Sequence, residues 1–296
     1  MEKYTALIVD IEKSRKYGLR ERNEIQEYLS ECIIRLNDVF KSSLECQVTF
    51  SGGDEIQGLF VDPVVAIMYF RLLEILMKPI KLRAGIGIGE WTVRREYGLS
   101  TQQDGPVYHK AREAIDEVYK SQFQSIRIVS EDEDVLVNHL INTSHVLKGQ
   151  QVDMQNLVQV MVELIYPFVT PKMNMRYLDR IDELIELKCQ YGPKSFSVAG
   201  RESSILMDRE MYIGEVIEIN PIVIDGVIRD GEKILLKRNM ASNLAKILGC
   251  TRQNADSIIR RGNINKIREL DYMALQYMEQ KYGGDYDTDS FRSYFR

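Results

Sequence analysis

The chain has 296 residues, of which 44% are hydrophobic and 28% are charged, which is enough for a folded core in one large or two modest domains. The formal net charge of −5 excludes a protein that binds nucleic acid through its overall charge, although it leaves room for a local basic patch.

Three features predict a cytoplasmic protein without a membrane span. The N-terminal sequence turns acidic within its first residues and lacks the long apolar core of a signal peptide. The longest apolar stretch, residues 64–77, is interrupted by Arg71 and Glu74, which predicts a buried helix. The 4 cysteines show no CxxC spacing and the 3 histidines do not pair with them, so we expect no zinc site and a reducing compartment.

The first segments of the chain predict strands and a helix. Residues 4–11 are apolar at nearly every position, with Asp10 as the exception near the end, which predicts a central strand covered on both faces. Residues 20–42 carry one apolar stripe and predict an amphipathic helix. The sequence VTFSGGDEIQGLF, residues 48–60, predicts a hairpin whose turn is Gly52-Gly53, so that Asp54 begins the second strand.

The next segments complete an α/β unit over residues 1–130. An N-cap aspartate followed by proline predicts a helix over residues 62–77. The sequence KLRAGIGIGE, residues 81–90, alternates between apolar residues and a glycine-rich face that a helix or a ligand can approach closely. A helix over residues 105–120 and a short strand over residues 125–129 follow. These elements predict an α/β (α+β) sandwich with a mixed sheet.

The second half of the chain predicts mainly helices. We expect a helical region at 131–211, a small β element or linker at 212–240, a helix-turn-helix module at 241–283 and a tail at 284–296.

The helix-turn-helix prediction rests on the sequence NLAKILGCTRQNADSIIRRG, residues 243–262. Gly249 permits the turn and Thr251 caps the second helix. Residues 240–270 contain six lysines or arginines and two acids, a local net charge of 6 − 2 = +4. We expect the outward face to bind double-stranded DNA, with Lys266 and Arg268 on phosphates, although an ordinary helical hairpin fits the same pattern. The predicted DNA-binding residues of this helix are Arg252, Gln253 and Asn254 at base edges, Ser257 on the same outward face, and Arg260 and Arg261, which also suit phosphates.

Two carboxylates carry the prediction of a catalytic site. If the strands that hold Asp10 and Asp54 are antiparallel neighbours, both side chains lie at one edge of the sheet. Two carboxylates and a strand-end carbonyl form a minimal site for Mg²⁺ or Mn²⁺, which binds substrate phosphates with its remaining positions. The polar loop after Asp10 offers Ser14 and Arg15 to those phosphates. The alternative reading of Asp10 is a strand-end aspartate that caps a loop.

The order of these motifs resembles that of nucleotidyl cyclase-like palm domains. Asp10-Ile11 with its polar loop, SGGDE, LRAGIGIGE and GPVYHKAREAI follow one another as in class III cyclases and GGDEF diguanylate cyclases. The chain is similar to the SatD family, which joins such a domain to a C-terminal helix-turn-helix. The resemblance covers roughly the first 130 residues and a short C-terminal piece. It implies a ferredoxin-like palm fold and a metal held by Asp10, the carbonyl of Ile11 and Asp54.

The resemblance also assigns roles on the helix after the glycine-rich strand. Cyclases carry an asparagine and, four residues later, an arginine that hold the ribose and the transition-state charge; here these positions are Tyr108 and Arg112. The resemblance implies that Arg112 contacts phosphate and that Tyr108 lies by the nucleotide. From the residues alone, Arg112 also suits a salt bridge and Tyr108 also suits the core. The asparagine is not kept, and Ile56 replaces the phenylalanine of the GGDEF motif.

Two functions remain open from the sequence. The first is a metal-dependent nucleotidyltransferase that cyclises or joins nucleoside triphosphates, with Asp10, Asp54 and Arg112 as its catalytic residues. The second is a catalytically silent nucleotide sensor that controls DNA binding. A homodimer is compatible with both, because cyclases and helix-turn-helix proteins often pair.

Overall fold

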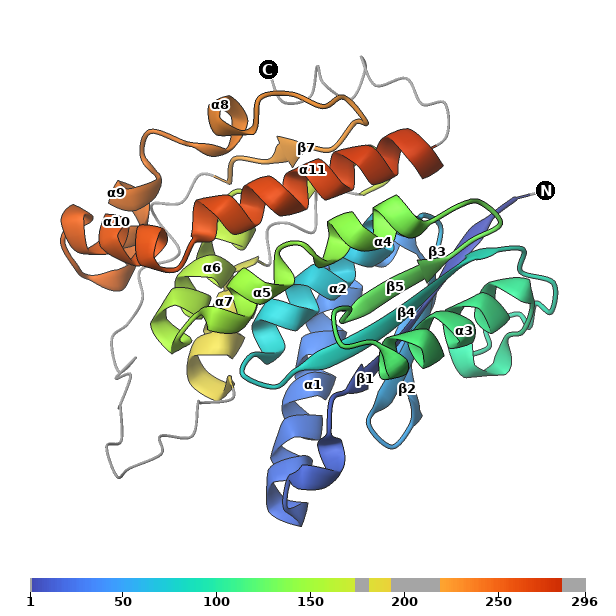
Figure 1. Cartoon of the computed structure of the whole chain (residues 1–296). Coiled ribbons are helices and arrows are strands. Elements are labelled where there is room, and N and C mark those ends of the chain that lie inside the picture. Colours follow the sequence, from blue (N-terminus) through green and yellow to red (C-terminus); the bar gives the residue numbers. More distant parts are fainter. Residues whose placement is uncertain (1, 174–180, 193–218, 284–296) are drawn as a thin grey trace.

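The computed structural model describes residues 2–173, 181–192 and 219–283 (Figure 1). The predicted tail at 284–296 lies outside the described residues, as does the beginning of the predicted β element. Within the described part of the chain, no helix combines the length and the apolar character that crossing a membrane requires.

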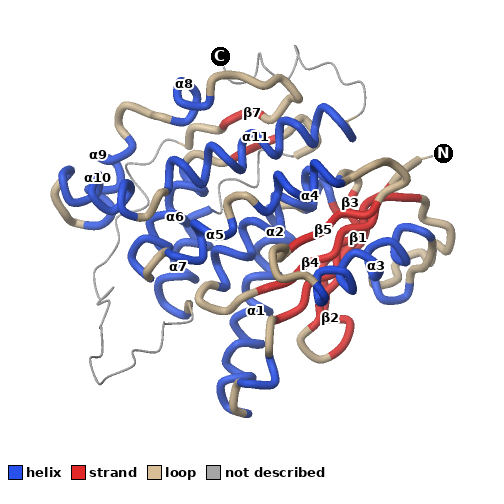
Figure 2. The backbone as a smooth tube through the Cα atoms, in the orientation of Figure 1, coloured by secondary structure: helices blue, strands red, loops and turns tan. Residues whose placement is uncertain are grey.

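A five-stranded mixed sheet forms the centre of the N-terminal half, with the strand order β2-β3-β1-β4-β5 (Figure 2). Strand β1 lies between β3 and β4 and is antiparallel to both, whereas β5 is parallel to β4. The mixed sheet that the sequence predicts is therefore confirmed. The strands are β1 (Tyr4–Ile11), β2 (Leu44–Gly52), β3 (Glu55–Phe60), β4 (Leu82–Gly89) and β5 (Ile126–Val129).

Helices cover both faces of this sheet. Helices α1 (Leu19–Val39) and α2 (Pro63–Met77) bury their apolar stripes in the same core as Leu7 and Val9 of β1. Helix α3 (Pro106–Lys120) packs in a second core with the alternate residues of β1, among them Ala6 and Ile8. Because side chains alternate along a strand, Asp10 lies on the α3 face of the sheet.

The glycine-rich face of β4 is what brings α3 so close. A Cβ added to Gly85 would lie 2.4 Å from the carbonyl oxygen of Ala111, and one added to Gly87 would lie 2.1 Å from that of Val107. Any side chain at these positions would push the helix away. The expected close approach of a helix is confirmed.

The β2–β3 hairpin differs by one residue from the prediction. Gly52 pairs with Glu55, so the two turn residues are Gly53 and Asp54, and Gly53 has the positive φ of 62°. The expected turn at Gly52-Gly53 is wrong, because either glycine can adopt this backbone conformation and the sequence does not select between them. Glu55, and not Asp54, is therefore the first residue of the strand.

The outer edge of β5 is covered by two amide side chains of α4 (Val135–Asn142). The Asn138 side chain accepts from the Ile128 N–H at 2.6 Å and donates to the Ile128 carbonyl at 2.8 Å. Asn142 accepts from the Ser125 N–H at 2.9 Å and donates to the Ile126 carbonyl at 2.8 Å. The two asparagines bond to β5 as a neighbouring strand would.

The rest of the described chain is mainly helical, as expected, and shares one hydrophobic core with α1 and α2. A short parallel pair, β6 (Phe168–Val169) and β7 (Ile222–Val223), lies beside it. Gly249, with φ of 59°, ends α9, and the Thr251 hydroxyl accepts from the Asn254 N–H at 3.2 Å to cap α10. The helices are α5 (His145–Gln150), α6 (Asp153–Ile165), α7 (Ile181–Tyr191), α8 (Gly231–Leu235), α9 (Met240–Leu248), α10 (Arg252–Arg261) and α11 (Ile264–Tyr282).

Candidate functional site

The sheet brings Asp10 and Asp54 together at one edge. Asp10 lies near the end of β1, and Asp54 lies in the turn that leads into β3, the neighbour of β1. Burial raises the pKa of Asp10 above its usual range, and the negative charge of Asp54 raises it further. The Oδ2 atom of Asp54 is buried and has no hydrogen-bond partner in the described part of the chain. The two carboxylates therefore repel each other in a partly buried environment, where water screens their charges poorly.

This pair fits a hard divalent cation. Its donors are carboxylate oxygens, the type that Mg²⁺ and Mn²⁺ prefer, and a cation would neutralise their repulsion and give Asp54 Oδ2 a partner. Among the described residues, no group of three or more histidine, cysteine, aspartate or glutamate side chains is arranged to hold a metal ion. A cation at Asp10 and Asp54 would thus depend on backbone oxygen, for which the carbonyl of Ile11 is the expected donor, and on the oxygens of its ligand.

Tyr119, in the last turn of α3, is a member of this site that sequence reasoning missed. Its hydroxyl hydrogen-bonds the carboxylate of Asp10, an interaction that lowers the pKa of Asp10 against the effects of burial and Asp54. The guanidinium of Arg83 lies 5.6 Å from the centre of the Tyr119 ring. A signal was present in the sequence, since Tyr119 follows Arg112 by two helical turns and shares its face of α3.

Arg112 lies at the same edge but contacts Glu55. Its Nη1 donates to Glu55 Oε2 at 2.6 Å and its Nη2 donates to Glu55 Oε1 at 2.7 Å. The Ser51 hydroxyl also donates to Glu55 Oε1, at 2.8 Å. Of the two roles left open for Arg112, the salt bridge is the one present in this structure, and its partner is the residue after Asp54.

Ser14 and Arg15 lie in the short turn that follows β1. Ser14 begins a single 3-10 turn that ends at Lys16, and the carbonyl of Ser14 accepts from the side chain of Arg22 at 3.2 Å. Arg15 is exposed, and Ser14 is half-buried. Both therefore lie within a few residues of Asp10, on the loop that the sequence assigns to phosphates.

Tyr108 lies in the core under α3. Its side chain is 8% exposed, and its hydroxyl is 3.2 Å from the hydroxyl of Ser100. The ring packs with Val107 and Leu59 in the core between α3 and the sheet. This position agrees with the core-packing alternative for Tyr108, and its phenol already has a protein partner.

The comparison with known families adds one decisive observation. A model of the SatD family matches residues 4–172. The chain belongs to the SatD family. The match contains the whole sheet with Asp10, Asp54 and Arg112, and it ends before α9 and α10. No curated protein matches the chain.

The helix pair beyond the SatD match exposes most of its predicted DNA-binding residues. Arg252, Gln253, Asn254, Arg260 and Arg261 are exposed on α10, and Ser257 is half-buried. Arg260 pairs with Asp256 at 3.0 Å on the same face. The basic face that the sequence predicts is thus open to a partner.

The expectation that Arg268 binds phosphate is wrong. Its side chain is 0% exposed, because it forms an ion pair with Glu163 of α6 and donates to the carbonyl of Tyr166. Arg268 lies on the apolar stripe of α11 together with Ile264 and Leu275, and this spacing is the signal that places it inside. Lys266, on the other side of α11, is exposed and pairs with Glu269 at 2.8 Å.

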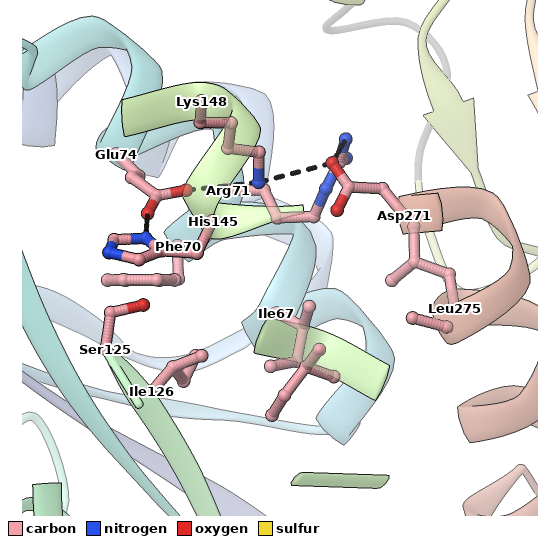
Figure 3. Close-up of a pocket in the computed structure, with 12 residues that line it drawn as sticks. Ile67, Phe70, Arg71, Glu74, Ser125, Ile126, His145, Lys148, Asp271 and Leu275 are labelled. Carbon is pink, nitrogen blue, oxygen red and sulfur yellow. Dashed lines mark hydrogen bonds and ion pairs between the residues drawn. The ribbon is translucent and has the colours of Figure 1, made fainter. Parts of the chain in front are cut away.

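Through Glu163, Arg268 belongs to a buried cluster of charges that joins the two halves of this SatD family chain. Figure 3 shows its members Arg71, Lys148 and Asp271. Arg71 of α2 donates to Glu163 at 3.1 Å and to Asp271 of α11 at 2.6 Å. Lys148 of α5 lies 3.1 Å from Glu74 and 3.2 Å from Asp271. The cluster borders a cavity of about 10 Å³, which has room for about one water molecule. These charges pair with one another, so we assign the cluster a structural role.

Proposed function

We propose that this SatD family protein binds a nucleoside triphosphate with Mg²⁺ or Mn²⁺ at the edge of the sheet that holds Asp10 and Asp54. One observation carries the proposal: the fold places two carboxylates from distant parts of the chain side by side, raises the pKa of Asp10 and leaves a buried oxygen of Asp54 without a partner. Such an arrangement costs stability unless a cation relieves it.

The topology supports a palm domain of the ferredoxin-like type. The order β1-α1-β2-β3-α2-β4, with β1 between β3 and β4, is the β-α-β-β-α-β arrangement of that fold. In this arrangement the end of β1 lies beside the β2–β3 turn. Asp10 and Asp54 occupy these two places, which are the positions of the metal-binding residues that the cyclase resemblance implies. The fold alone does not fix the reaction.

For the chemistry, we propose a displacement at phosphorus that cyclises or joins nucleotides: a ribose hydroxyl forms a bond to the α-phosphorus of a nucleoside triphosphate, its proton passes to solvent, and pyrophosphate leaves. A bound Mg²⁺ would supply charge neutralisation and orientation of the triphosphate. Asp10 and Asp54 would hold the ion, together with the carbonyl of Ile11, the residue after Asp10. Ser14 and Arg15, in the loop after β1, would receive the phosphates, and Arg112 would approach from α3.

A specific observation favours the second candidate, a nucleotide sensor without catalysis. The two cyclase positions on α3 are occupied by a buried tyrosine, Tyr108, and by an arginine that is bound to Glu55. In this reading the nucleotide is a signal and the output is DNA binding by α10, whose exposed arginines, glutamine and asparagine suit base edges and phosphates. None of the 4 cysteines, all of which lie in the described part of the chain, forms a disulfide, which suits a reducing cytoplasm, and a homodimer stays part of the proposal.

Two experiments test these proposals. Thermal unfolding with each of the four common nucleoside triphosphates, with and without Mg²⁺, should show a Mg²⁺-dependent rise in Tm for at least one nucleotide, and no rise with any of them would reject the nucleotide site. Incubation of the pure protein with labelled nucleotide and Mg²⁺ then separates the candidates. A new product indicates an enzyme, and binding without a product indicates the sensor.

A further inference from the structure

We propose that Glu55 competes internally for the phosphate-binding arginine: it holds Arg112 in an ion pair that an incoming polyphosphate must displace. We call the Glu55–Arg112 pair the latch. The inference rests on the proposed function and adds a regulation of the same site, because the strength of the latch sets how readily the site accepts its ligand.

The geometry of the latch is that of a phosphate mimic. Both terminal nitrogens of the Arg112 guanidinium donate to the two oxygens of Glu55, at 2.6 and 2.7 Å. A planar guanidinium forms the same paired hydrogen bonds with a phosphate. Glu55 thus occupies the donors that a phosphate would use, and exchanging one anion for the other keeps two charge-assisted hydrogen bonds.

The latch lies at the proposed cation site. Glu55 follows Asp54 directly, and it lies on the same face of β3 as Leu59, which packs against α3. The charge of Glu55 reaches Asp10 and raises its pKa, after the larger effects of burial and Asp54. Releasing Arg112 from Glu55 therefore leaves the guanidinium within the same group of charges as the two carboxylates.

The latch is open enough to exchange partners. The side chain of Arg112 is 46% exposed and that of Glu55 is 19% exposed, so a dissolved anion can reach the guanidinium. Arg268 is the contrast within the same chain, since its side chain is 0% exposed and its pair with Glu163 is closed to solvent. An exposed pair contributes little to stability and opens at low cost, whereas a buried one does not.

The latch is not needed to hold α3 on the sheet. The helix already contacts the backbone at Gly85 and Gly87 and buries Val107, Ala111 and Ile115 against β1 and β3. A half-exposed ion pair adds little to that packing. Its effect on ligand binding is larger, because the apparent affinity falls in proportion to the fraction of molecules whose Arg112 is free.

The test compares Glu55→Gln with a matched control, Asp116→Asn. Asp116 is an exposed acid one turn after Arg112, and its charge acts on Arg112 as that of Glu55 does. Titration calorimetry would use inorganic tripolyphosphate with Mg²⁺ as the probe, so that the result does not depend on the base. We expect Glu55→Gln to bind about twofold to fivefold more tightly than the wild type, and Asp116→Asn to stay within about 1.5-fold.

A measurement on the unmodified protein keeps the test independent of folding defects. The side-chain ¹⁵N signal of Arg112, assigned from the spectrum of Arg112→Lys, should move when the probe is added. Equal affinities of Glu55→Gln and Asp116→Asn, or an Arg112 signal that stays in place in a wild type that binds, would overturn the latch alone. No binding of ATP, GTP, CTP, UTP or the probe by the wild type would overturn the proposed function and the latch with it.

Discussion

The guanidinium of Arg71 donates to the carboxylate of Asp271 at 2.6 Å, although 200 positions separate them in the chain. Arg71 lies in α2, directly under the sheet, and Asp271 lies in α11, which follows α10. Both side chains are buried, and Lys148 adds a second cation at 3.2 Å from Asp271. Helix α11 is therefore fixed to the layer below the sheet.

Replacing Asp271 with alanine should cost about 3–5 kcal/mol of unfolding free energy, because it leaves Arg71 and Lys148 buried without one of their anions. Glu269→Ala on the same helix is the matched control. Its partner Lys266 is exposed, so that change should cost only about 0–1 kcal/mol. Denaturant unfolding of both variants gives the comparison, and losses of similar size would contradict the assignment.

The stability of the protein should fall in acid partly through Glu74. Burial alone would raise its pKa, but Lys148 and His145 lower the pKa of Glu74 from 4.5 to about 2. Because the folded pKa is the lower one, the contribution of Glu74 is complete above about pH 4.5 and is lost as the pH falls toward about 2. The wild type should therefore be more stable than Glu74→Gln above about pH 4.5, and this difference in unfolding free energy should shrink by about 1–3 kcal/mol as the pH falls toward about 2. A difference that is the same at pH 6 and pH 3 would reject this role.

Asp10→Asn and Asp54→Asn should have opposite effects with and without the cation. Without it, each change removes a like-charge contact, so the Tm should rise by roughly 1–3 °C or stay level. With Mn²⁺ and nucleotide, only the wild type should show a further increase in Tm. The corresponding gain in unfolding free energy is about 2.7 kcal/mol at a ligand concentration of 100 Kd. Asp132→Asn, at an exposed acid, is the control that should behave as the wild type. Retained Mn²⁺-dependent stabilisation in both aspartate variants would place the cation elsewhere.

Changes in the helix pair should separate the two kinds of DNA contact. Lys266→Ala should weaken binding to all sequences about equally and reduce the salt slope by about 1, as the loss of one phosphate contact does. Gln253→Ala should cost about 1–3 kcal/mol at one base position and relax the preference there. Lys233→Ala, on the exposed surface of α8, is the control. Fluorescence titrations against genomic fragments at several salt concentrations provide the measurement, and no salt-sensitive binding at low ionic strength would end the DNA proposal.

Much of the fold could be predicted because its signals are local. The N-cap of α2 is one example: Asp62 accepts from the Val64 N–H at 2.8 Å, as Asp-Pro at a helix start predicts. The glycine face of β4 is another, since it fixes the approach of α3 without reference to distant residues. The edge shared by Asp10 and Asp54 followed from the same kind of reasoning, because the hairpin placed β3 beside β1.

The remaining features depend on contacts between distant segments. The hairpin turn was misplaced by one residue, and the pairing of Glu55 with Arg112 joins residues 57 positions apart, which no local pattern shows. Arg268 has the charge of a surface residue; its spacing on α11 places it on the buried stripe, but its partner Glu163 lies in another helix. Charge and composition indicate which side chains need partners, but the sequence does not show which partner the fold supplies.

The side chains of Asn138 and Asn142, which cover the outer edge of β5, limit where the chain can be cut to isolate its N-terminal half. A fragment that ended at residue 130, where the last strand of the sheet is complete, would lack Asn138 and Asn142. Its outermost strand would present unpaired N–H and C=O groups to other copies, the condition under which sheets join edge to edge and precipitate. A fragment extended through α4 keeps both amides. Two asparagines beyond the sheet therefore set the earliest end point at which the edge of β5 stays covered. A fragment that ends there still lacks the later helices that share the core of α1 and α2, so expression trials should compare this boundary with the full chain.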